Sequence, residues 1–238
     1  MHPGRRLALA VILAAPLAAR AAQSARGAPV VYYALGDSTA LGVGAEQGGG
    51  YPARLARKLE QGGVPVRFTN VGVSGATVAE LRRDQVPKAI AGHPALVTLC
   101  IGINDLMQDR KLADFSRDLE IAADFLRRTQ AIVVISTIPD LSLSPSAKGA
   151  PPSLARRIDA YNAAIALIAE RHGFAVADVH GATRRALRDR GAELFAKDGF
   201  HPSAAGYELW AEAMWPTLER AVVAPRVQAR RPAPAPDR

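Results

Sequence analysis

Ser38, Asp198 and His201 are side chains of the types that could together carry nucleophilic catalysis. A serine hydroxyl is a poor nucleophile until a base removes its proton during attack. Imidazole titrates near neutral pH, so His201 could be that base, and Asp198 could hold the ring in the required tautomer. The order Ser, Asp, His along a chain is one of several that reach this geometry. Taken singly, Ser38 could be a helix N-cap and His201 a loop or capping histidine, so the prediction depends on the three lying together.

Gly75 and Asn104 are candidates for the electrophilic part of such a site. Attack on an ester carbonyl creates an oxyanion, which needs hydrogen-bond donors already in place. Gly75 has no side chain and could bring its backbone N–H close to that oxygen, while Asn104 could offer a side-chain N–H. Each residue also has a structural alternative, Gly75 as a turn glycine and Asn104 as a turn or cap residue.

The sequence around these residues predicts a parallel α/β fold. Short runs rich in Val and Ile are nearly continuous rather than alternating, which is typical of strands buried on both faces. Between them, apolar residues three or four apart predict helices, including 112–128 and 153–172. We expect a five-stranded parallel sheet with helices on both faces. The predicted strands are 30–35, 66–71, 96–101, 131–138 and 175–179.

Polar clusters follow the predicted strands. Three clusters end the first three strands, and a fourth lies between the last strand and a helical pattern at 203–222. Ligands of such sheets bind beyond the carboxyl ends of the strands, so we expect the clusters to meet at one rim. The clusters are GDS at 36–38, NVGVSGAT at 70–77, GIND at 102–105 and DGFHPS at 198–203.

These four clusters, in this order and over nearly the whole predicted domain, resemble the successive blocks of the SGNH (GDSL) hydrolase family. The resemblance implies a three-layer α/β/α sandwich of flavodoxin-like topology and a secreted bacterial protein similar to esterases and lipases. It implies Ser38 as nucleophile and His201 as base, with Asp198 behind the ring. It also implies three oxyanion donors, namely the Ser38 backbone N–H, Gly75 and Asn104.

Residues beside these blocks receive structural roles. The usual leucine of the family after GDS is Thr39 here, which leaves the subfamily open. Asp37 and Asp105 are expected to hold loops by hydrogen bonds. Cys100 lies within an apolar run and is expected to be a small buried hydrophobe. As the only cysteine, it excludes an internal disulfide and a zinc site built from several thiolates.

The ends of the chain differ in composition from its middle. Residues 1–22 carry arginines, a 13-residue apolar run and an Ala-Arg-Ala sequence, the order of a secretory signal peptide. The run is shorter than the about 20 residues of a spanning helix, and an uncleaved anchor is the alternative. No cysteine follows it, which excludes a bacterial lipid anchor. Residues 224–238, with four prolines, predict a disordered basic tail. We therefore expect one hydrolase domain at 23–223 and a secreted or periplasmic location.

The charge of the chain is concentrated at these ends. The 238 residues carry a net charge of +8, which by itself would favour nucleic acid or a membrane surface as partner. Three of these charges belong to residues 1–22 and three to the tail, so the domain keeps about +2. Its composition, with 49% apolar and 22% charged residues in the whole chain, excludes wholesale disorder.

Several classes of binding site are not expected. The glycines at 42–50 follow the first strand, but they lack the G-K-[ST] of a phosphate-binding loop, and we expect them to shape a mobile rim of the pocket. The remaining histidines have no metal-ligand spacing, so no metal or other cofactor is predicted. The arginines at 184–190 predict a solvated helix face. We expect a monomer whose partner is a small-molecule or lipid ester, with no nucleic acid and, after signal cleavage, no membrane insertion.

The function predicted from the sequence is that of a secreted serine esterase acting on acyl esters, thioesters or lysophospholipids. Leu106, Met107 and residues 40–43 could line an acyl pocket. One alternative is an O-acetylesterase acting on carbohydrate or cell-wall sugars with the same residues. An alternative of another class is a binding protein that keeps the fold without catalysis.

Overall fold

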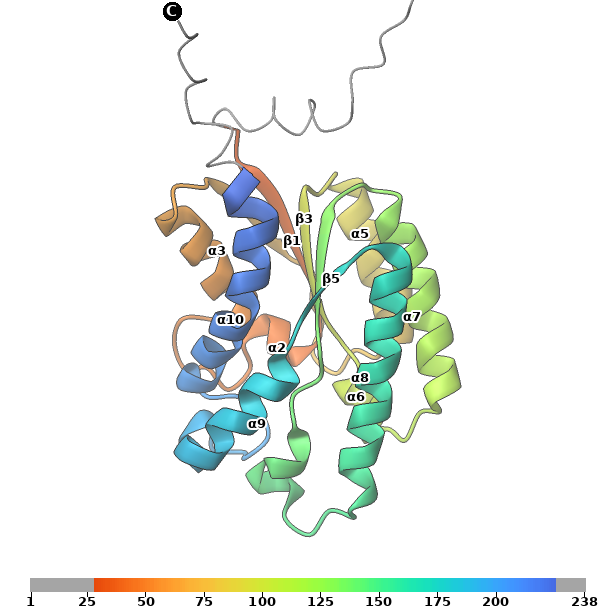
Figure 1. The fold of residues 1–238 in the computed structure, drawn as a ribbon, viewed down its shortest axis with the longest axis vertical. Coiled ribbons are helices and arrows are strands. Elements are labelled where there is room, and N and C mark those ends of the chain that lie inside the picture. Colours follow the sequence, from red (N-terminus) through yellow and green to blue (C-terminus); the bar gives the residue numbers. More distant parts are fainter. Residues whose placement is uncertain (1–27, 226–238) are drawn as a thin grey trace, which may run out of the picture.

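The computed structural model describes residues 28–225. Five parallel strands form one sheet in the order β2-β1-β3-β4-β5 (Figure 1). This strand order is the flavodoxin-like order predicted from the sequence, and the α/β class is confirmed. The strands are β1 (Val30–Gly36), β2 (Val66–Asn70), β3 (Leu96–Cys100), β4 (Ile132–Ser136) and β5 (Ala175–Ala177).

The central strands are buried and the edge strands are partly exposed. Every residue of β3 is buried, which explains its continuous apolar sequence, whereas Arg67 on the edge strand β2 is exposed. Cys100 ends β3 fully buried, as expected, and burial raises the pKa of its thiol to about 12. The register of β1 against both neighbours carries Gly36 to the level of Cys100, so the two strands end together.

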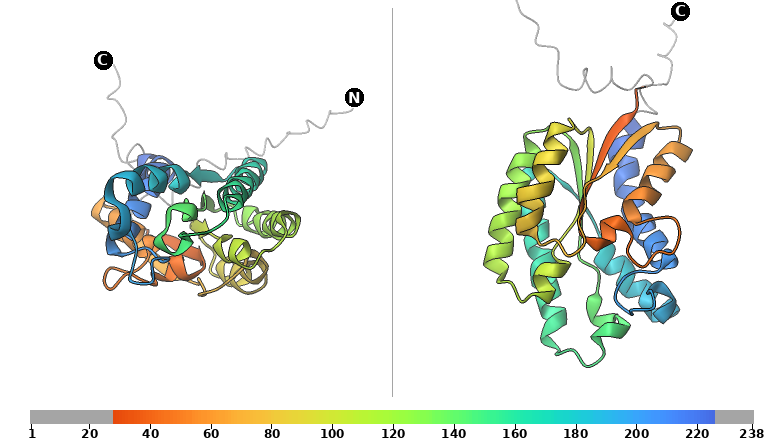
Figure 2. Two further views of the ribbon diagram at one scale, coloured as in Figure 1. Left: turned by 90° about the horizontal axis from the view of Figure 1, so that it is seen from below. Right: turned by 180° about the vertical axis from the view of Figure 1, so that it is seen from behind.

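Two layers of helices cover the sheet, which completes the three-layer sandwich (Figures 1 and 2). One layer contains α3 (Tyr51–Gln61) packed against α10 (Ala204–Leu218), and the other contains α5 (Val86–Ala91), α7 (Leu112–Arg127) and α8 (Ser153–His172). The further helices are α2 (Ser38–Leu41), α4 (Val78–Glu80), α6 (Ile103–Met107) and α9 (Val179–Arg190). Single π-helical turns occupy Leu81–Gln85 and Glu219–Val223, and 3₁₀ turns occupy Leu141–Leu143, Pro145–Ala147 and Gly191–Leu194.

Two strands end two residues earlier than predicted, and each has a local cause. The strand β4 ends at Ser136 because both backbone groups of Ile138 bind the side-chain amide of Asn162, at 2.7 and 3.0 Å. The strand β5 ends at Ala177 because Asp178 is the N-cap of α9 and accepts a hydrogen bond from Gly181 N–H. The arginines on the outer side of α9 are exposed, as predicted (Arg184, Arg185, Arg188 and Arg190).

The predicted signal peptide at 1–22 and residues 226–238 of the predicted tail lie outside the described residues. The helical backbone continues through Pro225, two residues into the segment predicted as tail. Within 28–225, no helix combines the length and the apolar character needed to cross a membrane.

Candidate active site

Ser38 stands at the carboxyl end of β1, where the chain turns into α2. It is the first helical residue, and the N-cap is Asp37, whose Oδ1 accepts from Thr39 N (2.9 Å) and Thr39 Oγ1 (2.8 Å). The alternative in which Ser38 is itself the N-cap is therefore wrong, and its hydroxyl is left for other partners. Ser38 is only 6% exposed, so the surrounding protein holds its position closely.

His201 lies between the Ser38 hydroxyl and a carboxylate. Its Nε2 is 3.0 Å from Ser38 Oγ, and its Nδ1 is 2.6 Å from Asp198 Oδ2. The ring of Phe200 meets the imidazole edge-on, with ring centroids 5.1 Å apart. The structure thus brings together all three residues predicted for nucleophilic catalysis, although 163 positions separate Ser38 from His201.

Asp198 organises the loop that carries His201. Its second oxygen, Oδ1, accepts from the backbone N–H groups of Phe200 and His201, both at 2.9 Å. Burial would raise the pKa of Asp198, but the hydrogen bonds from the His201 ring and the two N–H groups outweigh it, so that the pKa lies below its usual value. An ionised carboxylate is the form that fixes the imidazole tautomer and stabilises an imidazolium.

The predicted oxyanion donors lie on three neighbouring segments of the same rim. The Ser38 N–H is at the first helical position of α2, where no carbonyl of its own helix can bind it. Gly75 is exposed and has φ +80°, a conformation that suits glycine, so its N–H stands on a sharp turn. Asn104, in the first turn of α6, donates one amide hydrogen to Ala76 O at 3.0 Å and retains a second. Among the described residues, the backbone N–H groups of Ser38 and Gly75 have no hydrogen-bond acceptor.

Further residues support these segments, and sequence inspection missed them. Thr77 and Glu80 form a capping box at the start of α4, directly after Gly75, and their Thr-x-x-Glu spacing was a usable signal. Asn70 donates to Ala40 O (2.7 Å) and accepts from Gly72 N–H (3.0 Å). Gln85 binds both backbone groups of Gly36, and no pattern in the sequence indicated this contact.

The two aspartates predicted as structural are both buried and hydrogen-bonded. Asp105 accepts from Val78 N–H (3.0 Å) and from Arg110 (2.9 Å); burial raises its pKa against these contacts. Asp37 is fully buried, and its Oδ2 has no hydrogen-bond partner. Burial raises the pKa of Asp37 to about 6, against the lowering effect of Thr39 and His201.

Gly44, one of the glycines after the first strand, lies against the His201 loop. A Cβ at Gly44 would be 2.9 Å from the Cβ of His201 and 2.7 Å from the carbonyl oxygen of Pro202. The φ of Gly44 is +91°, and the neighbouring Val43 carbonyl accepts from Tyr207 Oη at 2.7 Å. This part of the glycine-rich segment therefore packs against the backbone of the loop that carries His201.

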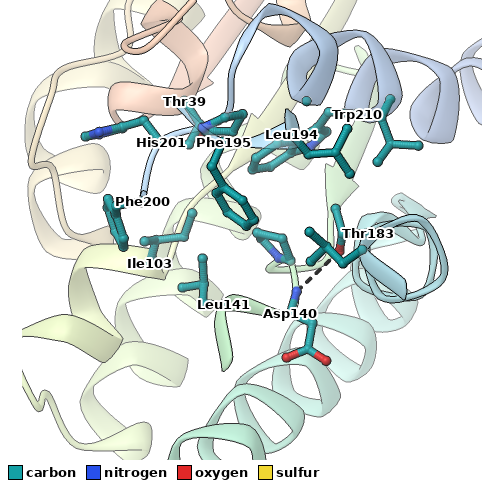
Figure 3. A pocket seen from close by; sticks show the side chains of 15 residues that line it. Thr39, Ile103, Asp140, Leu141, Thr183, Leu194, Phe195, Phe200, His201 and Trp210 are labelled. Carbon is teal, nitrogen blue, oxygen red and sulfur yellow. Dashed lines mark hydrogen bonds between the residues drawn. The ribbon is translucent and has the colours of Figure 1, made fainter. Parts of the chain in front are cut away.

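A narrow apolar cavity of about 40 Å³ adjoins His201 (Figure 3). In this view Phe200 and Ile103 lie on the His201 side, while Leu194 and Trp210 close the opposite side near Phe195. The prediction of an acyl pocket formed by Leu106, Met107 and residues 40–43 is wrong for this cavity. Leu106 is in the core and Met107 faces solvent, since α6 turns them away. The lining residues are Thr39, Ile103, Pro139, Asp140, Leu141, Thr183, Leu187, Leu194, Phe195, Phe200, His201, Pro202, Gly206, Leu209 and Trp210.

Comparison with known proteins gives consistent matches. Residues 34–209 match the GDSL-like Lipase/Acylhydrolase family. The chain is 28% identical over 154 residues to an acetylxylan esterase of Geobacillus stearothermophilus, covering 62% of this chain and 70% of the relative. It is 27% identical over 189 residues to Esterase TesA of Pseudomonas aeruginosa, covering 78% and 86%. Its fold is similar to the crystal structure of Axe2, an acetylxylan esterase from G. stearothermophilus, with a TM-score of 0.68, 24% identity and coverage of 80% and 94%.

Proposed function

The chain belongs to the GDSL-like lipase/acylhydrolase family and is an ester hydrolase, and from this premise we propose that it is an exported serine esterase working through an acyl-enzyme. The observation that carries the proposal is the position of His201, hydrogen-bonded to Ser38 Oγ on one side and to Asp198 on the other. Ser38 is the nucleophile, His201 the general base and Asp198 the residue that orients the imidazole.

In the first half of the reaction, Ser38 Oγ attacks the ester carbonyl carbon while its proton passes to His201 Nε2. The carbonyl oxygen becomes an oxyanion, and the Ser38 N–H, the Gly75 N–H and Asn104 Nδ2 donate to it. As the tetrahedral intermediate collapses, the C–O bond to the alcohol breaks. The alcohol leaves with the proton from His201, and the acyl group stays on Ser38.

In the second half, water takes the place of the alcohol. His201 removes a proton from water as the water oxygen attacks the acyl carbon, and a second oxyanion forms at the same donors. Collapse breaks the bond to Ser38 Oγ, which recovers the proton from His201 as the carboxylic acid leaves. The residues close this cycle without a metal or organic cofactor, and we expect turnover to survive EDTA.

Labelling with a fluorophosphonate probe tests the nucleophile. We expect the wild-type chain to be labelled on Ser38 and to hydrolyse p-nitrophenyl acetate, and Ser38→Ala to lose both. Ser116→Ala, the same change on helix α7, is the matched control and should behave as wild type. Absence of labelling and turnover in the wild-type chain would favour the fold-preserving binding protein instead.

The apolar cavity beside His201 favours acyl esters or lysophospholipids as substrates over strictly acetylated sugars. Apolar side chains such as Ile103, Leu141 and Phe200 gain from contact with an acyl chain, which a one-carbon acetyl methyl barely reaches. The similarity to an acetylxylan esterase supports the second candidate, a carbohydrate O-acetylesterase. A series of p-nitrophenyl esters from C2 to C10 separates them. Turnover extending to C6 and longer supports the acyl-ester function, and activity on C2 alone supports the acetylesterase.

Export is proposed on the sequence of residues 1–22, with its arginines, apolar run and Ala-Arg-Ala site. Expression of the full chain in a bacterial host, followed by N-terminal sequencing of the extracytoplasmic protein, tests it. A mature protein starting near residue 23 supports export, and full-length protein confined to the cytoplasm contradicts it.

A further inference from the structure

The side chain of Gln85 binds the residue that ends the strand of the nucleophile. Its Oε1 accepts from Gly36 N–H at 2.9 Å, and its Nε2 donates to Gly36 O at 2.8 Å. Gln85 is 1% exposed, so both contacts are shielded from water. Only Asp37 separates this clamped residue from Ser38.

The Gln85 side chain supplies the hydrogen-bond acceptor that the sheet does not supply to Gly36 N–H. The N–H groups of Val71 and Val73, which follow β2, donate to the carbonyls of Ala34 and Gly36. The loop after β2 therefore still supplies hydrogen-bond donors to β1. The strand β2 nevertheless ends at Asn70, and Gly36 N–H binds the Gln85 amide instead of a strand carbonyl. Buried backbone groups are almost always paired, and here one side-chain amide acts as a short extra strand.

The same residue belongs to the segment that carries an oxyanion donor. Gln85 ends the π-helical turn at Leu81–Gln85, which continues α4, and α4 starts three residues after Gly75. A π-helical turn inserts an extra residue into a helix and is often found at functional sites. Two further contacts tie this segment to the third donor: Asn104 binds Ala76 O, and Asp105 binds Val78 N–H.

The loop of Gly75 borders a hollow. A hollow of about 120 Å³ lies against Val73–Ala76, and its other walls are Glu80, Asp84 and Gln85. Val73, Ser74 and Gly75 are all exposed on the outer side. The position of the loop relative to Ser38 therefore depends on hydrogen bonds, and two of these contacts reach Gly36 on the nucleophile strand, the Val73 N–H bond to Gly36 O and the Gln85 clamp.

We propose that Gln85 is a positioning residue for the ester hydrolysis: its amide fixes the Gly36–Ser38 turn against the Gly75 segment and so sets the Ser38 and Gly75 N–H groups in register. The proposal rests on the proposed function, because it assumes that these two groups stabilise the oxyanion. Misplacement of preorganised donors destabilises the transition state rather than weakening substrate binding, so it should lower kcat.

Gln85→Leu removes both hydrogen bonds at similar side-chain size. We expect kcat on p-nitrophenyl acetate and the rate of fluorophosphonate labelling to fall together by about 10- to 100-fold, with KM changed less than about threefold. Thr129→Val is the control, since Thr129 also makes a two-bond contact with the backbone, donating to Leu126 O and accepting from Ala131 N–H, but before β4, at the end of the sheet opposite to the site. It should lower the melting temperature and leave kcat within about twofold of wild type.

Gln85→Glu gives a second readout that a purely structural role would not produce. A protonated glutamic acid can accept from Gly36 N–H and donate to Gly36 O as the amide does, whereas the ionised form sets a carboxylate oxygen against that carbonyl. Burial raises the pKa of such a carboxyl toward neutrality. The ratio of variant to wild-type kcat should therefore rise as the pH falls from about 8.5 to about 6.

The outcomes separate the two proposals. Loss of kcat in Gln85→Leu but not in Thr129→Val, together with a Gln85→Glu ratio that rises on acidification, supports the positioning role; the Gln85→Glu ratio alone decides if Gln85→Leu does not fold. Wild-type kcat in folded Gln85→Leu, equal losses in Gln85→Leu and Thr129→Val, or a Gln85→Glu ratio independent of pH overturns it. An unlabelled, inactive wild-type chain would instead overturn the proposed function itself.

Discussion

Ser38 stands at the end of a buried central strand, whereas Asp198 and His201 stand on a loop between α9 and α10. The Ser38 region is held by the sheet and by buried amide contacts, and the residue is almost inaccessible. In the second region the side chains are 48% exposed for Asp198 and 19% for His201. The two regions meet in the hydrogen bond between His201 Nε2 and Ser38 Oγ.

The carboxylates of the two regions show what this difference achieves. Asp37, in the buried region, has its pKa raised to about 6 by burial. Asp198, in the open loop, has its pKa lowered because three hydrogen-bond donors together outweigh its desolvation, which is the largest single effect. Groups that must hold geometry are placed in the core, and the carboxylate that must stay charged is placed near solvent.

Removal of the imidazole breaks the hydrogen bond between the two regions and has the largest expected effect. For His201→Ala we expect kcat to fall by about 10⁴- to 10⁶-fold, because Ser38 then lacks its base. Steady-state hydrolysis of p-nitrophenyl acetate measures this. His172→Ala, whose ring pairs with Glu120 at the far end of α8, is the control and should retain wild-type turnover. A loss below about tenfold in His201→Ala would exclude the histidine as base.

Removal of one donor tests the oxyanion side. For Asn104→Ala we expect kcat to fall by about 10²- to 10³-fold with little change in KM, since the contact forms in the transition state. Thermal unfolding checks that the lost bond to Ala76 O leaves the fold intact. A variant whose loss lies in KM alone would show that Asn104 binds substrate and has no role at the oxyanion.

The pH profile of the wild-type chain tests the open region. The lowered pKa of Asp198 keeps this carboxylate ionised throughout the range in which imidazole titrates. The acid limb of kcat/KM should therefore contain no contribution from Asp198, and activity should fall as the pH is lowered through the range in which an imidazole base and the buried Asp37, with its pKa of about 6, take up protons. Activity that stays flat from about pH 8 to about pH 4.5 would contradict a histidine base.

A methyl group at Gly44 disturbs the open region by pressing on the loop that carries His201. Gly44→Ala should lower kcat by about tenfold, because the added Cβ meets His201 and Pro202 and displaces the imidazole. Gly63→Ala is the control for backbone strain, since φ is also positive there (+76°) and no atom lies within 4 Å of the added Cβ. Equal kcat in the two variants would show that His201 tolerates the displacement.

The sequence was sufficient for those features that depend on local pattern and on strand order. The five strands and the rim follow from apolar runs whose ends carry polar residues, because parallel strands end on one side. The five site residues were predicted from residue chemistry and from the resemblance of four polar clusters to a known family. Contacts made by single side chains over long separations were not predictable. Gln85 and Gly36 are 49 positions apart, and a glutamine within a polar helical segment has no feature that distinguishes a buried clamp from a surface residue. The lining of the cavity was predicted wrongly for the same reason, because it comes from five separate segments, including the 3₁₀ turns that follow β4 and α9.

Asp37→Asn sharpens the comparison between the carboxylates and has the smallest expected effect on turnover. The amide can still accept from Thr39 through Oδ1, and it places a neutral group where Asp37 Oδ2 has no partner. Because Asp37 touches the helix start and not the reacting atoms, we expect kcat to change less than about tenfold. The free energy of unfolding should change more clearly than turnover, since a buried charge is removed.

The sign of that change follows from proton binding. Near pH 4 the native state holds its proton on Asp37 while the unfolded state, with a pKa of 3.8, begins to lose it, so the wild-type chain loses stability as the pH rises toward about 6. Above that pH the ionised carboxylate disfavours folding by about 3 kcal/mol, which Asp37→Asn avoids. Thermal unfolding from pH 4 to pH 8 should show a gain in melting temperature that grows with pH in this variant.

Asp198→Asn should show the opposite, a loss in melting temperature that grows with pH, because the pKa of Asp198 is lowered in the native state. A gain in Asp37→Asn that is the same at pH 4 and pH 8 would mean that Asp37 is not the buried charge that the structure indicates.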